Sequence, residues 1–285
     1  MADDVASNRF FSCDGQAIAS RTLGQGRPTL LIHGFLVDAE LNWFRPGIAA
    51  AIAELGRQVI APDLRGHGAS AAPTELAQWP TDVLAMDQEA LIAHLGLTDY
   101  DLVGYSLGAR TAARMMVRGA RPGRAVLGGM GDTGVMQAGD RAALFEDAIK
   151  NGDQAMDPRM GRAVQGMMRR LDLKPEAMLG VLAAFAATTP DELRAVPVPT
   201  LVVCGAADHD NGSAEALAAL LPLGRAQVVH GDHTSAVADP SLTSAIVAFL
   251  RDGAWRRAPK RCWRGYRRGA CAMTDTSMFS RSSCW

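Results

Sequence analysis

Ser106 lies at the centre of the strongest chemical signal in the chain, the pentapeptide Gly-Tyr-Ser-Leu-Gly at residues 104–108. A β-type run precedes it at 100–103, and a helix-type run follows it at 107–117. Glycines two positions before and after the serine fit a strand-to-helix turn too tight for side chains there. The helix dipole then favours the negative charge that develops during nucleophilic attack. The alternative is that Ser106 only caps this helix.

The elements that would position this serine alternate along the chain. Short apolar runs rich in strand-forming residues occur at 29–32, 58–61, 100–103, 124–127, 199–204 and 226–229. Helix-like segments lie between or after them, at 41–55, 83–95, 107–117, 213–221 and 242–251. Continuous apolar strands are typical of a sheet buried on both faces. The sequence therefore predicts an α/β fold, with a mostly parallel central sheet flanked by helices and an antiparallel edge from residues 9–23.

Residues 131–196 interrupt the alternation. They hold helical pieces at 139–150, 160–171 and 175–187 and no clear strand. We therefore predict a small helical cap, inserted between two strands of an α/β domain that spans residues 1–252. Six methionines fall in this segment. Most are expected to pack the cap, and some to line an adaptable apolar pocket.

With four further segments, the motif at Ser106 resembles the α/β-hydrolase superfamily over roughly residues 9–252. Residues 32–35 (Ile-His-Gly-Phe) resemble the oxyanion loop of that family, and residues 62–70 the loop after its fourth strand. Residues 204–208 (Cys-Gly-Ala-Ala-Asp) resemble the loop that carries the catalytic acid. Residues 230–233 resemble the loop that carries the histidine. The segments also occur in the order found in the family, serine before acid before histidine.

The resemblance implies a catalytic triad of Ser106, Asp208 and His233. The serine is the nucleophile, the histidine is the general base and later the acid, and the aspartate fixes the tautomer of the imidazole. Two alternatives for the acid stay open: Asp210, two residues further along, and Asp132, which follows the strand at 124–127. The other histidines fall in structural turns, on a helix surface or off the family pattern: His33, His67, His94, His209 and His230.

The resemblance also implies an oxyanion hole formed by the backbone N–H groups of Phe35 and Leu107. Each such donor contributes about 3 kcal/mol to transition-state stabilisation. The expected reaction is attack of Ser106 on an ester-type carbonyl of a small or medium substrate, followed by hydrolysis of the acyl-enzyme. We expect no organic cofactor and no metal, because the chain has no Gly-rich phosphate loop and no cluster of metal-ligand spacing.

The net charge of −1 gives no case for a nucleic-acid or anionic-membrane partner. A small-molecule substrate is therefore the expected partner, and the oligomeric state stays open. No run of 18 or more apolar residues predicts a transmembrane helix. The first ten residues lack a secretory pattern, and only Cys13 and Cys204 occur within residues 1–252. Both observations predict a cytoplasmic location.

The near-zero charge conceals a sharp asymmetry. Residues 1–252 carry a net charge of −8, whereas residues 253–285 carry +7 and hold three of the five tryptophans. Such a change in composition indicates a boundary. We predict that residues 253–285 form a basic, disordered tail after a complete domain.

Two classes of function stay open beside ester hydrolysis. The same triad serves C–C bond hydrolases, lactonases, acyltransferases and perhydrolases, and the motifs do not separate these activities. A non-catalytic small-molecule receptor of the same fold belongs to a different class. Turnover would distinguish an enzyme from such a receptor, which binds its ligand stoichiometrically.

Overall fold

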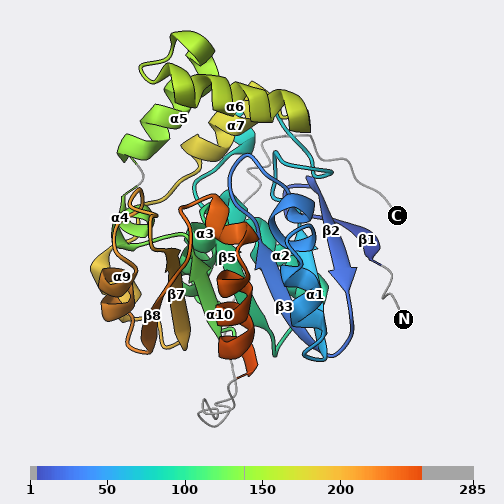
Figure 1. Cartoon of the computed structure of the whole chain (residues 1–285). Helices are drawn as coiled ribbons and strands as arrows, with labels where there is room; N and C mark the ends of the chain where they lie inside the picture. Colours follow the sequence, from blue (N-terminus) through green and yellow to red (C-terminus); the bar gives the residue numbers. More distant parts are fainter. Residues whose placement is uncertain (1–4, 138, 252–285) are drawn as a thin grey trace, which may run out of the picture. The chain divides into compact units, whose positions relative to one another are not determined.

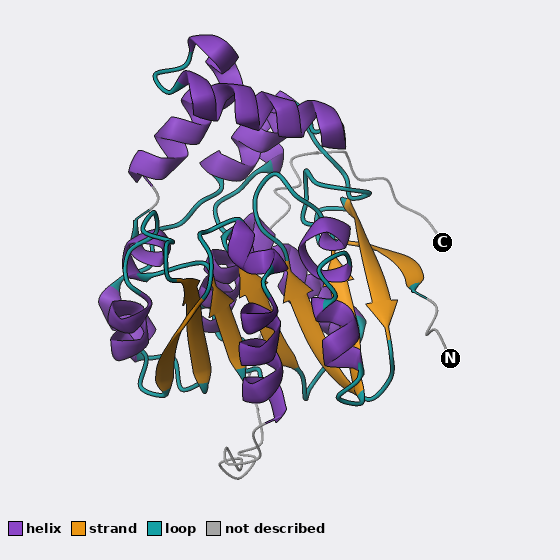
Figure 2. Ribbon diagram, in the orientation of Figure 1, coloured by secondary structure: helices purple, strands orange, loops and turns teal. Residues whose placement is uncertain are grey.

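The computed structural model describes residues 5–137 and 139–251, and the predicted tail at 253–285 lies outside the described residues. One sheet has the strand order β1-β2-β4-β3-β5-β6-β7-β8 (Figure 2). Strands β3 to β8 pair in parallel, while β1 and β2 form an antiparallel edge. The strand bounds are Ala6–Phe11, Ala17–Leu23, Arg27–Ile32, Arg57–Pro62, Asp101–Tyr105, Ala125–Gly128, Thr200–Gly205 and Gly224–Val229. The predicted α/β fold with a mostly parallel sheet is confirmed.

Helices cover both faces of the sheet (Figure 1). On one face pack α1 (Ile48–Ala53) and α10 (Pro240–Arg251), and on the other α2 (Val83–His94), α3 (Leu107–Val117) and α9 (Ala214–Leu220). Successive strand residues point to opposite faces, so Leu30 and Leu31 of β3 enter different core clusters. Every residue of β5 and β7 is buried, which explains why these strands are apolar beyond their first residues, Asp101 and Thr200.

The segment between β6 and β7 is helical, as the sequence predicts. It contains α4 (Asp132–Met136), α5 (Gly139–Asn151), α6 (Pro158–Leu171), α7 (Pro175–Ala183) and α8 (Pro190–Arg194). Helices α5, α6 and α7 form a layer beside the carboxyl edge of the sheet (Figure 1). Local sequence fixes where α6 begins, because the carboxylate of Asp157 accepts hydrogen bonds from the amides of Arg159 and Met160.

Two predicted helices are wrong in their extent, and the one expected at 175–187 already ends at Ala183 in α7. Residues 41–55 form a short π-helical segment (Glu40–Phe44) and then α1, rather than one continuous helix. Gly47 separates the two segments with a φ of 84°, a left-handed conformation that glycine adopts without strain. Among the described residues, no helix combines the length and the apolar character needed to cross a membrane.

Candidate active site

The turn between β5 and α3 is as tight as the glycine spacing predicts. A Cβ on Gly104 would lie 2.2 Å from the carbonyl oxygen of Gly108, and one on Gly108 would lie 1.9 Å from the carbonyl oxygen of Ile32. Ser106 has φ 54° and ψ −116°, a strained conformation for a residue with a side chain. The turn thus holds the serine at the N-terminus of α3, at the carboxyl edge of the sheet.

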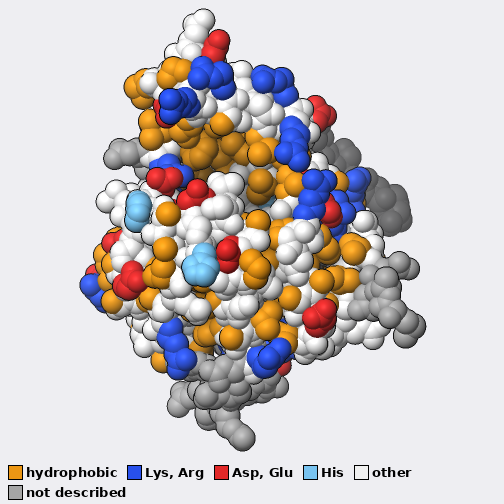
Figure 3. Space-filling view, in the orientation of Figure 1, with side chains coloured by type: hydrophobic (Ala, Val, Ile, Leu, Met, Phe, Trp, Pro, Cys, Tyr) orange, Lys and Arg blue, Asp and Glu red, His pale blue; other side chains and the backbone are white. Residues whose placement is uncertain are grey.

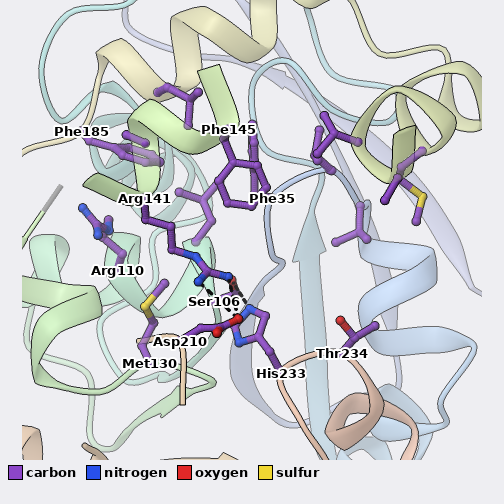
Figure 4. Close-up of a pocket in the computed structure, with 18 residues that line it drawn as sticks. Phe35, Ser106, Arg110, Met130, Arg141, Phe145, Phe185, Asp210, His233 and Thr234 are labelled. Carbon is purple, nitrogen blue, oxygen red and sulfur yellow. Dashed lines mark hydrogen bonds and ion pairs between the residues drawn. The ribbon is translucent and has the colours of Figure 1, made fainter. Parts of the chain in front are cut away.

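The structure brings the three residues of the predicted triad together. The Oγ of Ser106 lies 2.9 Å from Nε2 of His233, and Nδ1 of the same ring lies 2.8 Å from Oδ2 of Asp208. The carboxyl group of Asp208 is buried, whereas the imidazole remains partly open to the pocket. Figure 4 shows the serine and the histidine facing each other at the base of the pocket.

The two alternative acids lie elsewhere. Asp210 has a side chain that is 61% exposed and pairs with Arg141 of α5, at 3.3 Å between Nη1 and Oδ2. Asp132, at the start of α4, accepts a hydrogen bond from the amide of Ser213 at 2.8 Å. Both carboxylates therefore fix loops around the site, and only Asp208 reaches the imidazole among the three candidates.

Two residues that sequence reasoning missed hold the histidine loop. The hydroxyl of Tyr105 donates a hydrogen bond of 2.7 Å to the backbone oxygen of His233. The side-chain amide of buried Asn211 lies 3.2 Å from Nδ1 of the same histidine and donates to the carbonyl of Gly129 at 3.3 Å. Tyr105 occupies a variable position of the motif, and Asn211 follows Asp208 by three residues. Closeness in sequence to Ser106 and Asp208 was thus the only signal that could have indicated a role for these two residues.

The loop after β3 lies against the nucleophile. A Cβ on Gly34 would lie 3.4 Å from the Cβ of Ser106, and the Gly34 amide donates to the side chain of buried Asn42 at 2.8 Å. The backbone N–H groups of Phe35 and Leu107 donate to no described protein group. These two amides are therefore available at the site, where the sequence predicts an oxyanion hole.

His33 and His67 are buried beneath this loop as neutral rings. Nε2 of His33 accepts a hydrogen bond from the Leu64 amide at 2.8 Å, and Nε2 of His67 accepts one from the Leu36 amide at 3.3 Å. Burial lowers the pKa of His33 to about 4 and that of His67 to about 3. An acceptor nitrogen requires the neutral ring, so both histidines brace the loop rather than exchange protons at neutral pH.

The pocket above Ser106 has a volume of about 330 Å³ and lies between the sheet edge and the cap. Hydrophobic side chains gather in the hollow beneath the cap helices (Figure 3). The wall of the pocket comes from the loop after β3, the loop after β6, α3 and the cap. Its apolar side chains include Phe35, Leu36, Met130, Ala142, Phe145, Val164, Met167, Leu182 and Phe185. Of the six methionines predicted to pack the cap or line a pocket, Met167 lines it.

Neither a metal-ligand cluster nor Cys204 forms a second centre in the described part of the chain. Residues 5–137 and 139–251 contain no group of three or more His, Cys, Asp or Glu that could hold a metal ion. Burial raises the pKa of the Cys204 thiol to about 12, so this cysteine stays protonated and packs as a small core residue.

Comparison with known proteins supports the assignment of the fold. The model of the α/β hydrolase fold family matches residues 28–124. A non-heme haloperoxidase from Rhodococcus erythropolis is 31% identical over 251 residues, which cover 76% of this chain and 89% of the relative. An esterase from Exiguobacterium antarcticum has a similar structure, with a TM-score of 0.69 at 20% identity over 86% of this chain and 99% of the esterase. An enol-lactonase from Burkholderia xenovorans gives a TM-score of 0.67 at 22% identity, over 86% of this chain and 100% of the lactonase. These matches, together with the sheet and the turn at Ser106, show that the chain belongs to the α/β-hydrolase fold family.

Proposed function

We propose that the protein is a serine hydrolase that cleaves carboxylic esters of small or medium size through an acyl-enzyme on Ser106. One observation carries the proposal: an unbroken chain of hydrogen bonds runs from the serine Oγ through the imidazole of His233 to the buried carboxylate of Asp208. This chain opens into an apolar pocket of about 330 Å³. A nucleophile, a base and an orienting acid in hydrogen-bond reach are what acyl transfer requires.

In the proposed reaction, Nε2 of His233 takes the hydroxyl proton while the Oγ of Ser106 attacks the ester carbonyl. The tetrahedral oxyanion receives hydrogen bonds from the backbone amides of Phe35 and Leu107. The imidazolium then returns the proton to the leaving alcohol, which departs as the C–O bond breaks. Water, deprotonated by the same imidazole, attacks the acyl-enzyme and releases the carboxylic acid, restoring the serine.

The pocket sets the expected size of the substrate. A volume of about 330 Å³ lies near the lower end of the range for small-molecule sites, roughly 300–1,000 Å³. The wall that the cap contributes is mainly hydrophobic, with Phe145, Val164 and Met167 among its members. We therefore expect short and medium acyl chains to be preferred over long ones.

Turnover of p-nitrophenyl esters of increasing chain length tests the proposal. Ser106→Ala and His233→Ala should each lower kcat/KM by roughly 10³-fold or more. The exposed Ser7 and His94 provide matched controls, and Ser7→Ala and His94→Ala should retain the wild-type rate. A wild-type protein that hydrolyses none of the esters, yet binds small apolar ligands stoichiometrically, would favour the receptor alternative.

The similarity to a non-heme haloperoxidase supports a second candidate activity on the same residues. In this reaction hydrogen peroxide, instead of water, attacks the acyl group on Ser106, and the products are a peracid and the free serine. The peracid then oxidises bromide and is itself reduced to the carboxylic acid. Bromide oxidation should require both hydrogen peroxide and a carboxylic acid or ester, and should disappear in Ser106→Ala. Oxidation that persists in this variant excludes the route through the acyl-enzyme.

A further inference from the structure

Arg110 is a charged residue in the wall of the apolar pocket. It lies in the first turn of α3, which begins directly after Ser106, and both residues line the same pocket. The residue is 7% exposed and lines the pocket. Figure 4 shows it beside Phe185 on the pocket wall. The proposed reaction above gives this arginine no part.

Its surroundings differ from those of the other buried arginines. In the described part of the chain, three arginines are buried. Arg65 forms ion pairs with Asp87 and with a second carboxylate, and Arg57 pairs with Asp101 at 2.5 Å. Arg110 has no ion pair with any described residue. A buried charge normally requires a partner of opposite sign, so its absence here calls for a physical explanation.

The contacts of Arg110 leave part of its guanidinium unused. Nη2 donates to the backbone oxygens of Gly134 and Gln137, which are neutral acceptors, and the group lies 4.8 Å from the ring centre of Phe185. Nη1 is buried and has no hydrogen-bond partner in the described structure. Burial lowers the pKa of the guanidinium to about 10, which still leaves it charged at neutral pH. The carbonyls and the ring fix its position, but they do not neutralise its charge.

The rest of the pocket does not supply the missing charge. Asp210 is the only carboxylate among the described residues that line the pocket, and it is already paired with Arg141. Arg141 also lines the pocket, and the side chain of Asp210 is mostly exposed. The charges of Arg141 and Asp210 offset each other, so the pocket holds one uncompensated positive charge, at Arg110.

We propose that the substrate of this hydrolase carries one free carboxylate, which Arg110 binds while Ser106 attacks an ester or lactone carbonyl of the same molecule. The inference rests on the proposed function. A single negative charge balances a single guanidinium, and Nη1, which has no partner among the described residues, is left to donate to a carboxylate oxygen. Because both residues line one pocket of about 330 Å³, a small molecule has to span them, and the half-ester of a short dicarboxylic acid meets this requirement.

A matched pair of substrates tests the proposal: the mono-4-nitrophenyl ester of glutaric acid, and the same ester with its free carboxylate masked as a methyl ester. After subtraction of uncatalysed hydrolysis, wild-type kcat/KM should be at least about 10-fold higher for the free acid. Arg110→Met should reduce this ratio to about 1 or below, and Arg110→Lys should retain part of it. Arg118 lies at the end of the same helix, outside the pocket, and Arg118→Met should keep the wild-type ratio.

Two results would overturn the proposal. One is a wild-type ratio of 1 or less. The other is an equal loss on both esters in Arg110→Met, which would assign the arginine a purely structural task at the start of the cap. If Arg110→Met does not fold, the proposal is tested by the ratio of kcat/KM values for the two esters in the wild type and in Arg110→Lys.

A binding measurement separates this inference from the proposed function. Monomethyl glutarate and dimethyl glutarate are titrated into Ser106→Ala by calorimetry, which requires no turnover. Binding of the anion at least 10-fold tighter than the neutral diester, lost when Arg110→Met is added, supports the carboxylate site even if no ester is hydrolysed. Equal or absent binding of the two ligands refutes it, even if neutral esters are hydrolysed well.

Discussion

Replacing Gly108 by alanine should disable the site without touching any of the proposed catalytic side chains. The new Cβ would lie 1.9 Å from the carbonyl oxygen of Ile32 and 2.8 Å from that of His33. Real contacts of this kind stay above 3.0 Å, so α3 and β3 must separate by about 1 Å. This movement pulls apart the amides of Leu107, on α3, and Phe35, on the loop after β3.

The expected losses of folding stability and of kcat follow from this displacement. Overpacking of this kind typically costs about 1–3 kcal/mol of folding stability. Loss of one well-placed oxyanion donor lowers kcat by roughly 10²–10³-fold, and a shift of about 1 Å at a reacting centre costs roughly 10²-fold. We therefore expect Gly108→Ala to lower kcat on p-nitrophenyl acetate by roughly 10²–10³-fold. Urea unfolding should show the protein to be destabilised but still folded.

Gly166 in α6 provides the matched control. No heavy atom lies within 4 Å of a Cβ placed there, and the residue is helical, so Gly166→Ala should stabilise the protein by up to about 1 kcal/mol and leave kcat unchanged. Wild-type kcat in Gly108→Ala would refute the reasoning, because it would show that the tight approach of α3 to β3 does not position the oxyanion amides.

Three further predictions concern the groups around the triad. Asp208→Asn should lower kcat by roughly 10⁴-fold, whereas Asp210→Asn should cost less than about 10-fold; equal losses in steady-state assays would contradict the choice of acid. Tyr105→Phe removes the hydroxyl that donates to the backbone of His233, so kcat should fall several-fold with little change in KM, and an unchanged kcat would show that the bond is not needed to hold the loop. The free energy of unfolding should fall as pH drops from about 6.5 towards 3, because burial lowers the pKa of His67 to about 3 and the unfolded chain binds the proton more readily. Urea titrations at several pH values should give a shallower decline for His67→Gln, and identical slopes would be evidence against a buried neutral ring.

Much of the fold was predictable because its determinants are local. The glycines around Ser106 specify a tight turn wherever it occurs, and the predicted helix at 107–117 coincides with α3. The predicted helix at 41–55 failed at Gly47, whose left-handed conformation depends on how the chain re-enters the sheet rather than on hydrophobic periodicity.

The site was predictable only in part, because its remaining determinants are long-range. The choice between Asp208 and Asp210 depends on which carboxylate packs inward, and spacing alone does not fix this. Asn211 contacts His233 from a different loop, so no local sequence pattern predicts this contact. Arg110 lies on the apolar side of a helix that could have buried it against an acid. That Arg110 has no carboxylate partner among the described residues follows only from the three-dimensional structure of the pocket.

Covalent labelling of the nucleophile tests the central claim most directly. The purified protein is incubated with a fluorophosphonate, and the modified peptide is identified by mass spectrometry. We predict one adduct per chain, on Ser106, which is absent in Ser106→Ala and forms much more slowly in His233→Ala because the serine then has no base. Labelling at another residue, or an equal rate in His233→Ala, would contradict the account.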